Sequence, residues 1–425
     1  MTFKEYSSIN EHVYTTKLPN GLTIYVVPKP EFHKKFAFFA TKYGGADRRF
    51  KLGEEWIDTP AGVAHFLEHK MFDTENGNAL EHLSQNGASP NAYTENDMTA
   101  YYFECTDKFM ENLEILLSFV STPHFTAESV EKEQGIIAQE IRMCDDDSGF
   151  NLYYGLLQSL FKHNPLRENI VGTVESISQI TEEILYDCHK VFYNPSNMVL
   201  CVVGDIEPNA VTDIAQKVLP ETPGKSPQRD YGLPETLTPA IREGSKSMDI
   251  SLPIFLAGCK MMPVNPGADL LRSEIVSALA LDLLMGSSSP LFQRLYADGL
   301  VKSDFSASFN LAVDVAYVLF GGETRHPQKA YDEVMKEISR LITEGPDTAF
   351  FERLKKASIG SHIRALNSFG ILATGLVEGH FNSYDILTVP DILSTIEVDD
   401  VTQYLRENLV STRFAMYTIN PNNGK

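Results

Sequence analysis

Residues 61–72 read AGVAHFLEHKMF and contain the pattern His65-x-x-Glu68-His69. Positions i and i+4 of an α-helix lie on one face, so both imidazoles can point at one ion, with Glu68 beside them. The opposite side of the same helix is apolar and carries Val63, Phe66, Leu67 and Met71. We therefore expect a helix with one face in a core and the other face forming a chelate flanked by a carboxylate.

The chemistry of this face suits a zinc ion. Two neutral imidazoles bind Zn²⁺ at roughly 2.0–2.1 Å. The alternative is a pair of surface histidines beside a surface glutamate, because short motifs also arise by chance. The chain has only 11 His in 425 residues, and the apolar neighbours argue against a fully solvated helix. The motif therefore predicts a zinc site, although affinity order alone does not select zinc over other divalent ions.

A catalytic zinc usually takes three protein ligands and leaves one position for water. The helix expected from residue 127 onward supplies a candidate, because Glu133 and Glu140 share a stripe with apolar residues. Carboxylates on a buried stripe are costly unless they are paired or bind a metal. Glu140 as the third ligand, with Glu133 supporting a ligand from behind, would satisfy both. The alternative is a half-buried stripe on which both carboxylates are solvated.

Apolar periodicity and turn residues predict two domains that mix strands and helices. Residues 1–219 hold β-rich runs at 22–27 and 197–206, between segments of helical periodicity. The helices expected there cover residues 61–72, 78–86, 108–120, 127–145 and 150–161. Prolines and glycines accumulate over 220–247, which is typical of a linker or an extended connection. Residues 248–425 then hold expected helices at 268–285, 328–343 and 347–366 and strands at 315–320 and 413–420.

The two halves share a weak internal repeat. Residues 126–142 read TAESVEKEQGIIAQEIR, and residues 348–364 read TAFFERLKKASIGSHIR. The alternative is chance similarity between two amphipathic helices, but each copy follows a helix and a short loop in its own half. We therefore expect an α+β fold of two structurally related domains: a zinc-binding domain over 1–219, a linker over 220–247 and a related domain over 248–425. In the alignment Glu140 faces His362 and Glu133 faces Lys355, so the second domain is expected to lack the metal site.

The charge balance excludes some partners. With 36 basic and 57 acidic residues the net charge is −21, which argues against nucleic acid and anionic lipid. It is compatible with cationic ligands, but acidity for solubility alone is the preferred explanation. The five cysteines are scattered without a CxxC pair, so neither a disulfide framework nor a thiolate zinc site is expected. No apolar leader and no run near roughly 18 apolar residues is seen. We expect a cytoplasmic protein without a membrane span.

These motifs resemble the insulinase/pitrilysin family of zinc metallopeptidases, the inverzincins with an H-x-x-E-H motif. The resemblance is to bacterial single-half members, in particular a Bacillus-type subgroup, and to mitochondrial processing peptidase subunits. It covers most of the chain and is carried by LPNGLTIYVV, AGVAHFLEHKMF, NAYTENDMTAYYFE, EKEQGIIAQEI, NPLRENIVGTVESISQIT and FYNPSNMVLCVVGDI.

The resemblance implies a role for each residue of the predicted centre. His65, His69 and Glu140 correspond to the ligands of one Zn²⁺ per chain. Glu68 corresponds to the catalytic general base, and Glu133 to the glutamate that completes the catalytic group from behind a ligand. The implied activity is that of a zinc metalloendopeptidase acting on unstructured peptides.

The resemblance also implies how substrate and partner bind. Asn91 and Ala92 correspond to a segment that pairs with the substrate backbone as an added strand. The family fold implies that two similar α+β domains form one half of a clamshell. Its second half would come from another subunit, in a homodimer or in a heterodimer with a related subunit.

One stretch departs from the family pattern. Active members usually carry an Arg and a Tyr that bind the substrate carbonyl, and residues 289–306 read SPLFQRLYADGLVKSDFS. Tyr296 falls where that Arg is expected, Arg294 has a different phase, and Val301 to Ser303 include no Tyr. The alternative function is therefore a non-catalytic or partner-dependent subunit of a heterodimeric peptide-processing complex. The complete set of His65, Glu68, His69 and Glu140 favours a catalytic chain.

Overall fold

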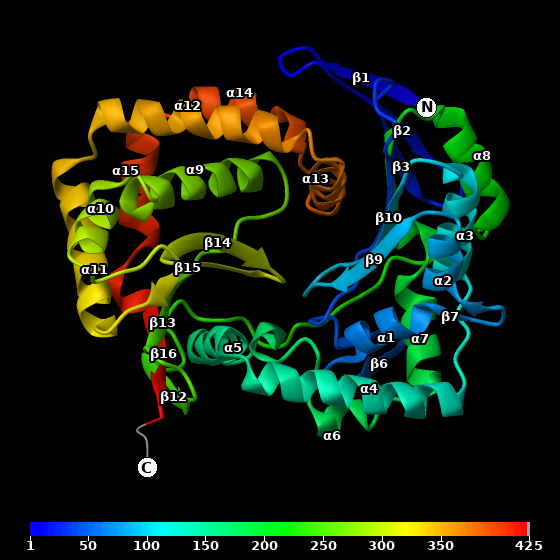
Figure 1. The fold of residues 1–425 in the computed structure, drawn as a ribbon, viewed down its shortest axis with the longest axis horizontal. Coiled ribbons are helices and arrows are strands. Elements are labelled where there is room, and N and C mark those ends of the chain that lie inside the picture. The colour runs from blue at the N-terminus through cyan, green and yellow to red at the C-terminus, as the bar shows by residue number, and fades with distance from the viewer. Residues whose placement is uncertain (423–425) are drawn as a thin grey trace. The chain divides into compact units, whose positions relative to one another are not determined.

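The computed structural model describes residues 1–422, and its first sheet has seven strands in the order β1-β2-β3-β11-β4-β10-β9 (Figure 1). β3 and β11 pair in parallel, and the other neighbours are antiparallel. β11 reads MVLCVVG and is buried at every position, as expected of a strand covered on both faces. The strands are β1 (Thr2–Tyr6), β2 (Glu11–Lys17), β3 (Thr23–Pro28), β4 (Lys35–Thr41), β9 (Ser89–Thr94), β10 (Thr99–Cys105) and β11 (Met198–Gly204).

Helices and two small hairpins complete this part of the chain. The hairpins are β5 (Arg49–Leu52) with β6 (Glu55–Asp58) and β7 (Asp73–Thr74) with β8 (Gly77–Asn78). The helices are α1 (Val63–Met71), α2 (Ala79–Gln85), α3 (Phe109–Ser121), α4 (Ala127–Asp146), α6 (Val174–Ile177), α7 (Glu182–Phe192) and α8 (Pro208–Val218), with a short 3₁₀ turn at Pro195–Asn197. All five helices predicted for the first domain from the sequence are present, four of them here and the fifth, α5, described below.

A second sheet of five strands has the order β12-β16-β13-β15-β14. Its one parallel pair joins β12 and β16, and the other pairs are antiparallel. This order repeats β3-β11-β4-β10-β9 of the first sheet, with the same sense at every step, which confirms the prediction of two structurally related domains. The strands are β12 (Glu243–Met248), β13 (Ile254–Met261), β14 (Ser306–Ala312), β15 (Val315–Glu323) and β16 (Phe414–Pro421).

The remaining helices include the two copies of the sequence repeat. Residues 127–142 of the first copy lie on α4, and residues 348–364 lie on its topological counterpart, α12 (Thr348–Ala365). The predicted helix at 268–285 is α9 (Ala268–Met285). The other helices are α5 (Ser148–Leu160), α10 (Pro290–Ala297), α11 (Pro327–Glu344), α13 (Phe369–Phe381), α14 (Val389–Thr395) and α15 (Val398–Asn408), with 3₁₀ turns at Pro165–Arg167, Ile386–Thr388 and Ser411–Arg413.

The chain forms two compact units that are not continuous in sequence. Unit 1 comprises Met1–Ile141, Asn169–Tyr231 and Ile363–Leu387, and unit 2 comprises Arg142–Glu168, Gly232–His362 and the chain from Thr388 onward. These units differ from the predicted ranges 1–219 and 248–425, because one helix from each range packs on the sheet of the other.

The packing of α5 and α13 explains why the two units are not continuous in sequence. α13 covers one face of the first sheet, where its Leu372 and Val377 are fully buried against Phe38 and Val199. α5 covers one face of the second sheet, where Leu156 and Leu160 join the core with Tyr317 and Leu319. α5 approaches β16 so closely that a Cβ on its Gly155 would lie within 2.4 Å of the Tyr417 ring. Each sheet is therefore completed by a helix that the sequence order assigns to the other domain.

The segment 220–247, predicted as a linker or an extended connection, is divided between the units and is partly fixed. Arg229 forms an ion pair with the buried Asp47 at 2.8 Å and a β-bridge with Phe50 in unit 1. Glu235 lies in unit 2, where its carboxylate accepts backbone N–H groups of residues 162–164 and pairs with Lys260. Residues 243–247 already belong to β12. The proline-rich composition therefore marks an extended connection that packs on both units.

One helical stretch of the described residues is apolar enough to be tested as a membrane span. By length and composition alone, residues 268–297 would suffice to cross a membrane, and 67% of the relevant window is buried in the structure. α9, which supplies most of this stretch, contacts α11, α15 and β14 of unit 2. The packing of a core helix accounts for its apolar residues.

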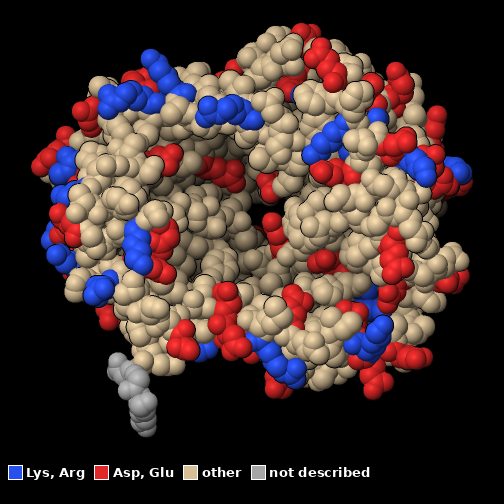
Figure 2. All heavy atoms as spheres, viewed as in Figure 1, with Lys and Arg blue, Asp and Glu red and all other residues tan. Residues whose placement is uncertain are grey.

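All five cysteines are free, and four of them are buried. On the face drawn in Figure 2, Asp and Glu side chains are scattered over both units, whereas Lys and Arg form no continuous patch. This distribution agrees with the net charge of −21 and gives no basic surface on that face for nucleic acid.

Candidate metal centre

The helix α1 carries the H-x-x-E-H motif and is buried along most of its length. Gly62 precedes it with φ of +91°, a conformation that side chains with a Cβ rarely adopt. A Cβ on Gly62 would also lie 2.7 Å from the carbonyl oxygen of Val171. Phe66 and Leu67 are fully buried, and His65 and Glu68 are only 9% and 7% exposed. The motif is therefore part of a buried helix, which is more enclosed than the two-faced helix predicted from the sequence.

The helix α4 brings the two predicted carboxylates to the motif. Its buried residues are Val130, Ile137 and Ile141, on the stripe that was predicted to hold Glu133 and Glu140. The Glu133 side chain is 14% exposed and the Glu140 side chain 38% exposed. Apolar packing on this stripe therefore places both carboxylates against α1 rather than in open solvent.

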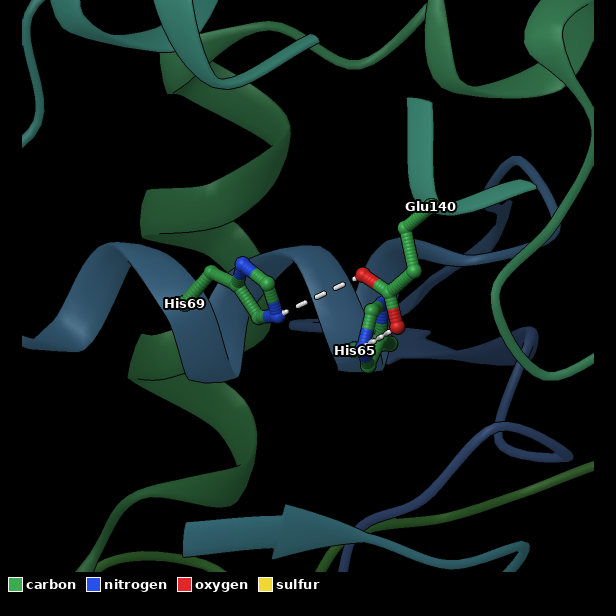
Figure 3. Close-up of side chains that lie close together, drawn as sticks. All are labelled: His65, His69 and Glu140. Atoms are coloured by element: carbon green, nitrogen blue, oxygen red, sulfur yellow. Dashed lines mark ion pairs between the residues drawn. The ribbon is translucent and has the colours of Figure 1, made fainter. Parts of the chain in front are cut away.

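Three side chains converge at one point. The ligand atoms of His65, His69 and Glu140 all lie within 4.8 Å of one another, and Figure 3 shows the Glu140 carboxylate facing both imidazoles of α1. Nε2 of His65 lies 3.5 Å from Oε1 of Glu140, and Nε2 of His69 lies 3.8 Å from Oε2. Within residues 1–422 this is the one group of three or more such side chains that could hold a metal ion.

These distances fit an ion better than they fit hydrogen bonds. Hydrogen bonds of the N–H···O type are about 2.7–3.2 Å long, so both contacts with Glu140 are too long. Two atoms that each lie roughly 2.0–2.1 Å from a tetrahedral zinc ion are about 3.3–3.4 Å apart. The Nδ1 atom of His65 is buried and has no hydrogen-bond partner among the described residues. The donor set therefore suits zinc, and the two contacts with Glu140 would shorten by about half an ångström or less to reach that spacing.

Burial keeps His65 in the form that binds metal. Burial and the neighbouring His69 together lower the pKa of His65 to about 3. The ring is therefore neutral at physiological pH, with a lone pair available.

Glu133 orients the second histidine. Nδ1 of His69 lies 3.0 Å from Oε1 of Glu133. Burial alone would lower the pKa of His69, but the hydrogen bond with Glu133 and the charges of Glu68, Glu133 and Glu140 outweigh it and raise the pKa. With its proton on Nδ1, the ring presents the lone pair of Nε2 to Glu140.

Glu68 lies on the same face of α1 and is held by a strand. Thr94, at the end of β9, donates a hydrogen bond from Oγ1 to Oε2 of Glu68 at 2.9 Å. Burial raises the pKa of Glu68, and the charge of Glu140 adds to this, whereas Thr94 and His69 act in the opposite direction. A carboxylate with a raised pKa next to a metal site is suited to accept and return a proton.

The predicted substrate-binding residues lie on an edge strand. Asn91 and Ala92 are in β9, which ends the first sheet and pairs only with β10 among the described strands. The Asn91 side chain accepts a hydrogen bond from its neighbour's amide at 2.8 Å. The structure places this strand beside α1, and Thr94 of the same strand reaches Glu68.

The stretch that departs from the family pattern lies on α10. Ser289 caps this helix by accepting a hydrogen bond from the amide of Phe292, so the serines before it form a turn and a helix start. Arg294 pairs with Glu333 of α11 at 2.7 Å. Tyr296 is 53% exposed and stacks on Phe292.

The position equivalent to the metal centre in unit 2 has different chemistry. Lys355, which aligns with Glu133, donates to the carbonyl oxygen of Ile396 at 3.0 Å and also pairs with Glu352. His362 aligns with Glu140. A cation thus replaces the supporting carboxylate.

Two residues near the centre were not predicted. Thr94 follows the predicted pair on β9 by two residues, and its hydroxyl contacts Glu68 only because β9 packs against α1. Lys70 directly follows the motif and is fully buried. Its position next to Met71 and Phe72 in the sequence could have indicated that this lysine is buried.

Comparisons with known proteins agree with this geometry. Residues 57–174, which hold the motif and both α4 glutamates, match the family model described as insulinase, peptidase family M16. Residues 179–358 match the model described as the inactive domain of peptidase M16.

Full-length relatives extend these matches. The chain is 36% identical to an uncharacterized zinc protease, YmfH, of Bacillus subtilis, over 98% of both chains. It is 30% identical to the beta subunit of the mitochondrial-processing peptidase of Caenorhabditis elegans, over 43% of this chain and 41% of that one. A crystal structure of an M16-like peptidase from Alicyclobacillus acidocaldarius superimposes with a TM-score of 0.92, at 32% identity and 99% coverage of each chain. The chain therefore belongs to the insulinase family, peptidase family M16.

Proposed function

We propose that this protein is a zinc-dependent endopeptidase that hydrolyses internal peptide bonds of unstructured peptides. The observation that carries the proposal is Glu68, a buried carboxylate on the same helix face as the convergent His65, His69 and Glu140. A purely structural metal site needs four protein ligands and no free carboxylate, whereas a catalytic site keeps three ligands and an open position. The names of the relatives, which are zinc proteases, support the same reading.

The residues of the centre divide the chemistry between them. His65, His69 and Glu140 would hold the ion, which supplies a Lewis acid that lowers the pKa of a water and polarises a carbonyl. Glu68 accepts a proton from the attacking water and then carries it to the nitrogen of the leaving amine. Thr94 holds one oxygen of Glu68, so the other oxygen is free to exchange the proton. Glu133 keeps the His69 ring turned toward the ion.

The edge strand β9 supports the proposed substrate class. Its free edge presents unpaired backbone groups, which an extended peptide can bind by strand addition whatever its side chains. Because Thr94 at the end of β9 contacts Glu68, a peptide paired along Asn91 and Ala92 would run toward the general base. A folded protein presents few free strands and would be a poor substrate.

A partner-dependent subunit is the second candidate function. The observation that favours it is α10, where Arg294 already pairs with Glu333 and Tyr296 occupies the position expected for an Arg. One matching relative is named as a subunit of a processing peptidase, and the model that matches residues 179–358 is described as inactive. On this account, a second copy or a related chain contributes the groups that bind the substrate carbonyl.

Cleavage of a peptide mixture by the zinc-loaded chain tests the proposal. Mass spectrometry should detect internal cleavages by the wild type that Glu68→Gln loses while retaining zinc. Glu104→Gln, at an exposed glutamate of β10, is the matched control and should cleave as the wild type does. Unchanged cleavage by Glu68→Gln would refute the assignment of the base. Bound zinc without cleavage would favour the partner-dependent subunit.

A further inference from the structure

We propose that Lys70 is a positioning residue for the metal centre, whose buried ammonium fixes α1 against the first turn of α4. The inference rests on the proposed metal site but not on peptide cleavage. It concerns how His65 and His69, on one helix, are aligned with Glu140 on another.

The environment of Lys70 is unusual for a lysine. Its side chain is 1% exposed. Nζ donates a hydrogen bond to the Asp73 carboxylate, at the start of β7, and another to the carbonyl oxygen of Ser129 in α4 at 3.3 Å. Lysines are almost never fully buried unless they are paired, so these contacts explain how the ammonium is tolerated.

Lys70 and His69 together clamp α4 at two points one helical turn apart. His69 binds the Glu133 carboxylate at 3.0 Å, and the next residue, Lys70, binds the carbonyl of Ser129. In a helix the carbonyl of residue 129 is the acceptor for the amide of residue 133. The two contacts therefore add a polar constraint on the position and rotation of the first part of α4 to the apolar packing of Val130 and Ile137.

The ligand Glu140 is far along α4 from the contact at Ser129. Glu140 lies eleven residues beyond Ser129, which is about 16 Å along the helix at 1.5 Å per residue. A tilt of about 5° at Ser129 would therefore move Glu140 by roughly 1.4 Å. Ligand distances in metal sites are met to within about 0.2 Å, so a small loss of alignment is enough to weaken binding.

We expect Lys70 to contribute little to the stability of the fold. The Asp73 side chain is 42% exposed and can be hydrated when the ammonium is removed. The Ser129 carbonyl keeps its helical hydrogen bond. An apolar side chain in place of a buried ion-pair partner is often tolerated when no charge is left buried. Lys70→Met should therefore change folding little while releasing α4 from its second anchor.

Lys260 offers a matched control in unit 2. Its side chain is 3% exposed, and it likewise binds a carboxylate and a helix-end carbonyl, those of Glu235 and Leu160. The partner Glu235 is 7% exposed, so Lys260→Met leaves a buried charge and should lower stability more than Lys70→Met does. Lys260 contacts no residue of the metal centre.

Zinc affinity of the apo protein tests the inference by competition with a chelator, and thermal unfolding is measured in parallel. Lys70→Met should raise the zinc Kd by about 10- to 100-fold, the range for losing a group that orients a ligand, with little change in Tm. Lys260→Met should lower Tm and leave the Kd unchanged. Asp73→Asn, at a partly exposed side chain, should raise the Kd by less than Lys70→Met, and it decides the matter if Lys70→Met does not fold.

Two results would overturn the inference. One is a wild-type Kd in Lys70→Met, or in Asp73→Asn where that variant decides. The other is a rise in Kd for Lys260→Met in proportion to its loss of stability, which would make the effect global. His65→Ala tests the metal site separately from the role of Lys70. If it also binds zinc normally, the metal site itself is wrong, whereas loss of zinc there with normal binding in Lys70→Met rejects the positioning role alone.

Discussion

The Nδ1 atom of His69 lies 3.0 Å from Oε1 of Glu133, and this contact links the two helices that share the metal centre. It fixes which nitrogen of His69 carries the proton and turns Nε2 toward Glu140. The centre is thus assembled by a side-chain contact between segments 64 residues apart. In the proposed centre Glu133 would therefore act through a ligand and not by binding the ion.

Glu133→Gln should weaken zinc binding by about 10- to 100-fold without abolishing it. The amide is neutral and is a poorer acceptor for the His69 N–H, so the ring loses its preferred tautomer and orientation. Isothermal titration of the apo protein with zinc measures the change. Glu131→Gln, on the exposed face of α4, is the control. Equal affinities of the two variants would contradict the role of Glu133.

Gly62→Ala should destabilise the protein by more than about 2 kcal/mol. The left-handed backbone costs a residue with a Cβ roughly 1–2 kcal/mol, and the added carbon would press on the Val171 carbonyl. Gly53→Ala is matched, because Gly53 also has positive φ but nothing lies within 4 Å of its Cβ position. Urea unfolding should show about 1 kcal/mol for Gly53→Ala. Equal losses in the two variants would show that the contact with Val171 has no effect.

Glu235→Gln should lower the free energy of unfolding by roughly 3 kcal/mol at pH 7, because it leaves the Lys260 ammonium buried without its partner. The carboxylate also accepts backbone N–H groups of residues 162–164 at 2.5–2.9 Å, which the amide oxygen can keep. Urea unfolding measures the difference, with the exposed Glu54→Gln as the control. A loss no larger than that of Glu54→Gln would contradict the structural role of this pair.

The pair of Glu235 and Lys260 makes the free energy of unfolding depend on pH. Burial by itself raises the pKa of Glu235, but hydrogen bonds from Lys260 and from the amides of His163 and Asn164 outweigh it and lower the pKa. Its contribution to stability is therefore full above the unfolded value of about 4.3 and is lost as the pH falls through the lower folded value. The difference between wild type and Glu235→Gln should shrink on acidification below about pH 4. A difference that grows there would reverse the sign assigned to this pKa.

Basic peptides should be cleaved faster than acidic ones at low salt. The net charge is −21, and a field of one sign raises the encounter rate with ligands of the opposite sign by about 10-fold or more. We expect kcat/KM to favour Lys/Arg-rich peptides several-fold and the preference to decline with added salt, as exposed charges are screened. Equal rates for both peptide classes at low ionic strength would remove charge as a basis of selectivity.

The sequence predicted the centre because its geometry is mostly local. The i and i+4 spacing of His65 and His69 is a property of any helix. The stripe of α4 that carries Glu133 and Glu140 follows from the burial of Val130 and Ile137. The contact between α1 and α4 was inferred because the carboxylates of Glu133 and Glu140, on a buried stripe, each need a partner or a metal ion.

Features that depend on long-range packing were not predictable in the same way. No helix was predicted over residues 369–381, and apolar residues such as Leu372 do not indicate on which sheet a helix packs. The exchange of α5 and α13 between the two ranges was therefore not predicted. The hydroxyl of Thr94 has no periodic signal and meets Glu68 only through the packing of β9 on α1. The anchors of the proline-rich segment, Arg229 and Glu235, were not predicted, because isolated polar side chains leave no periodic pattern in the sequence.

Zinc stoichiometry by native mass spectrometry tests the central claim most directly. We predict one zinc ion per wild-type chain, and loss of that ion in His65→Ala and in Glu140→Gln. His12→Ala, in the strand β2, should retain the ion. A wild type that binds no zinc, or a His65→Ala variant that keeps its full complement, would contradict the metal centre from which the proposed function is argued.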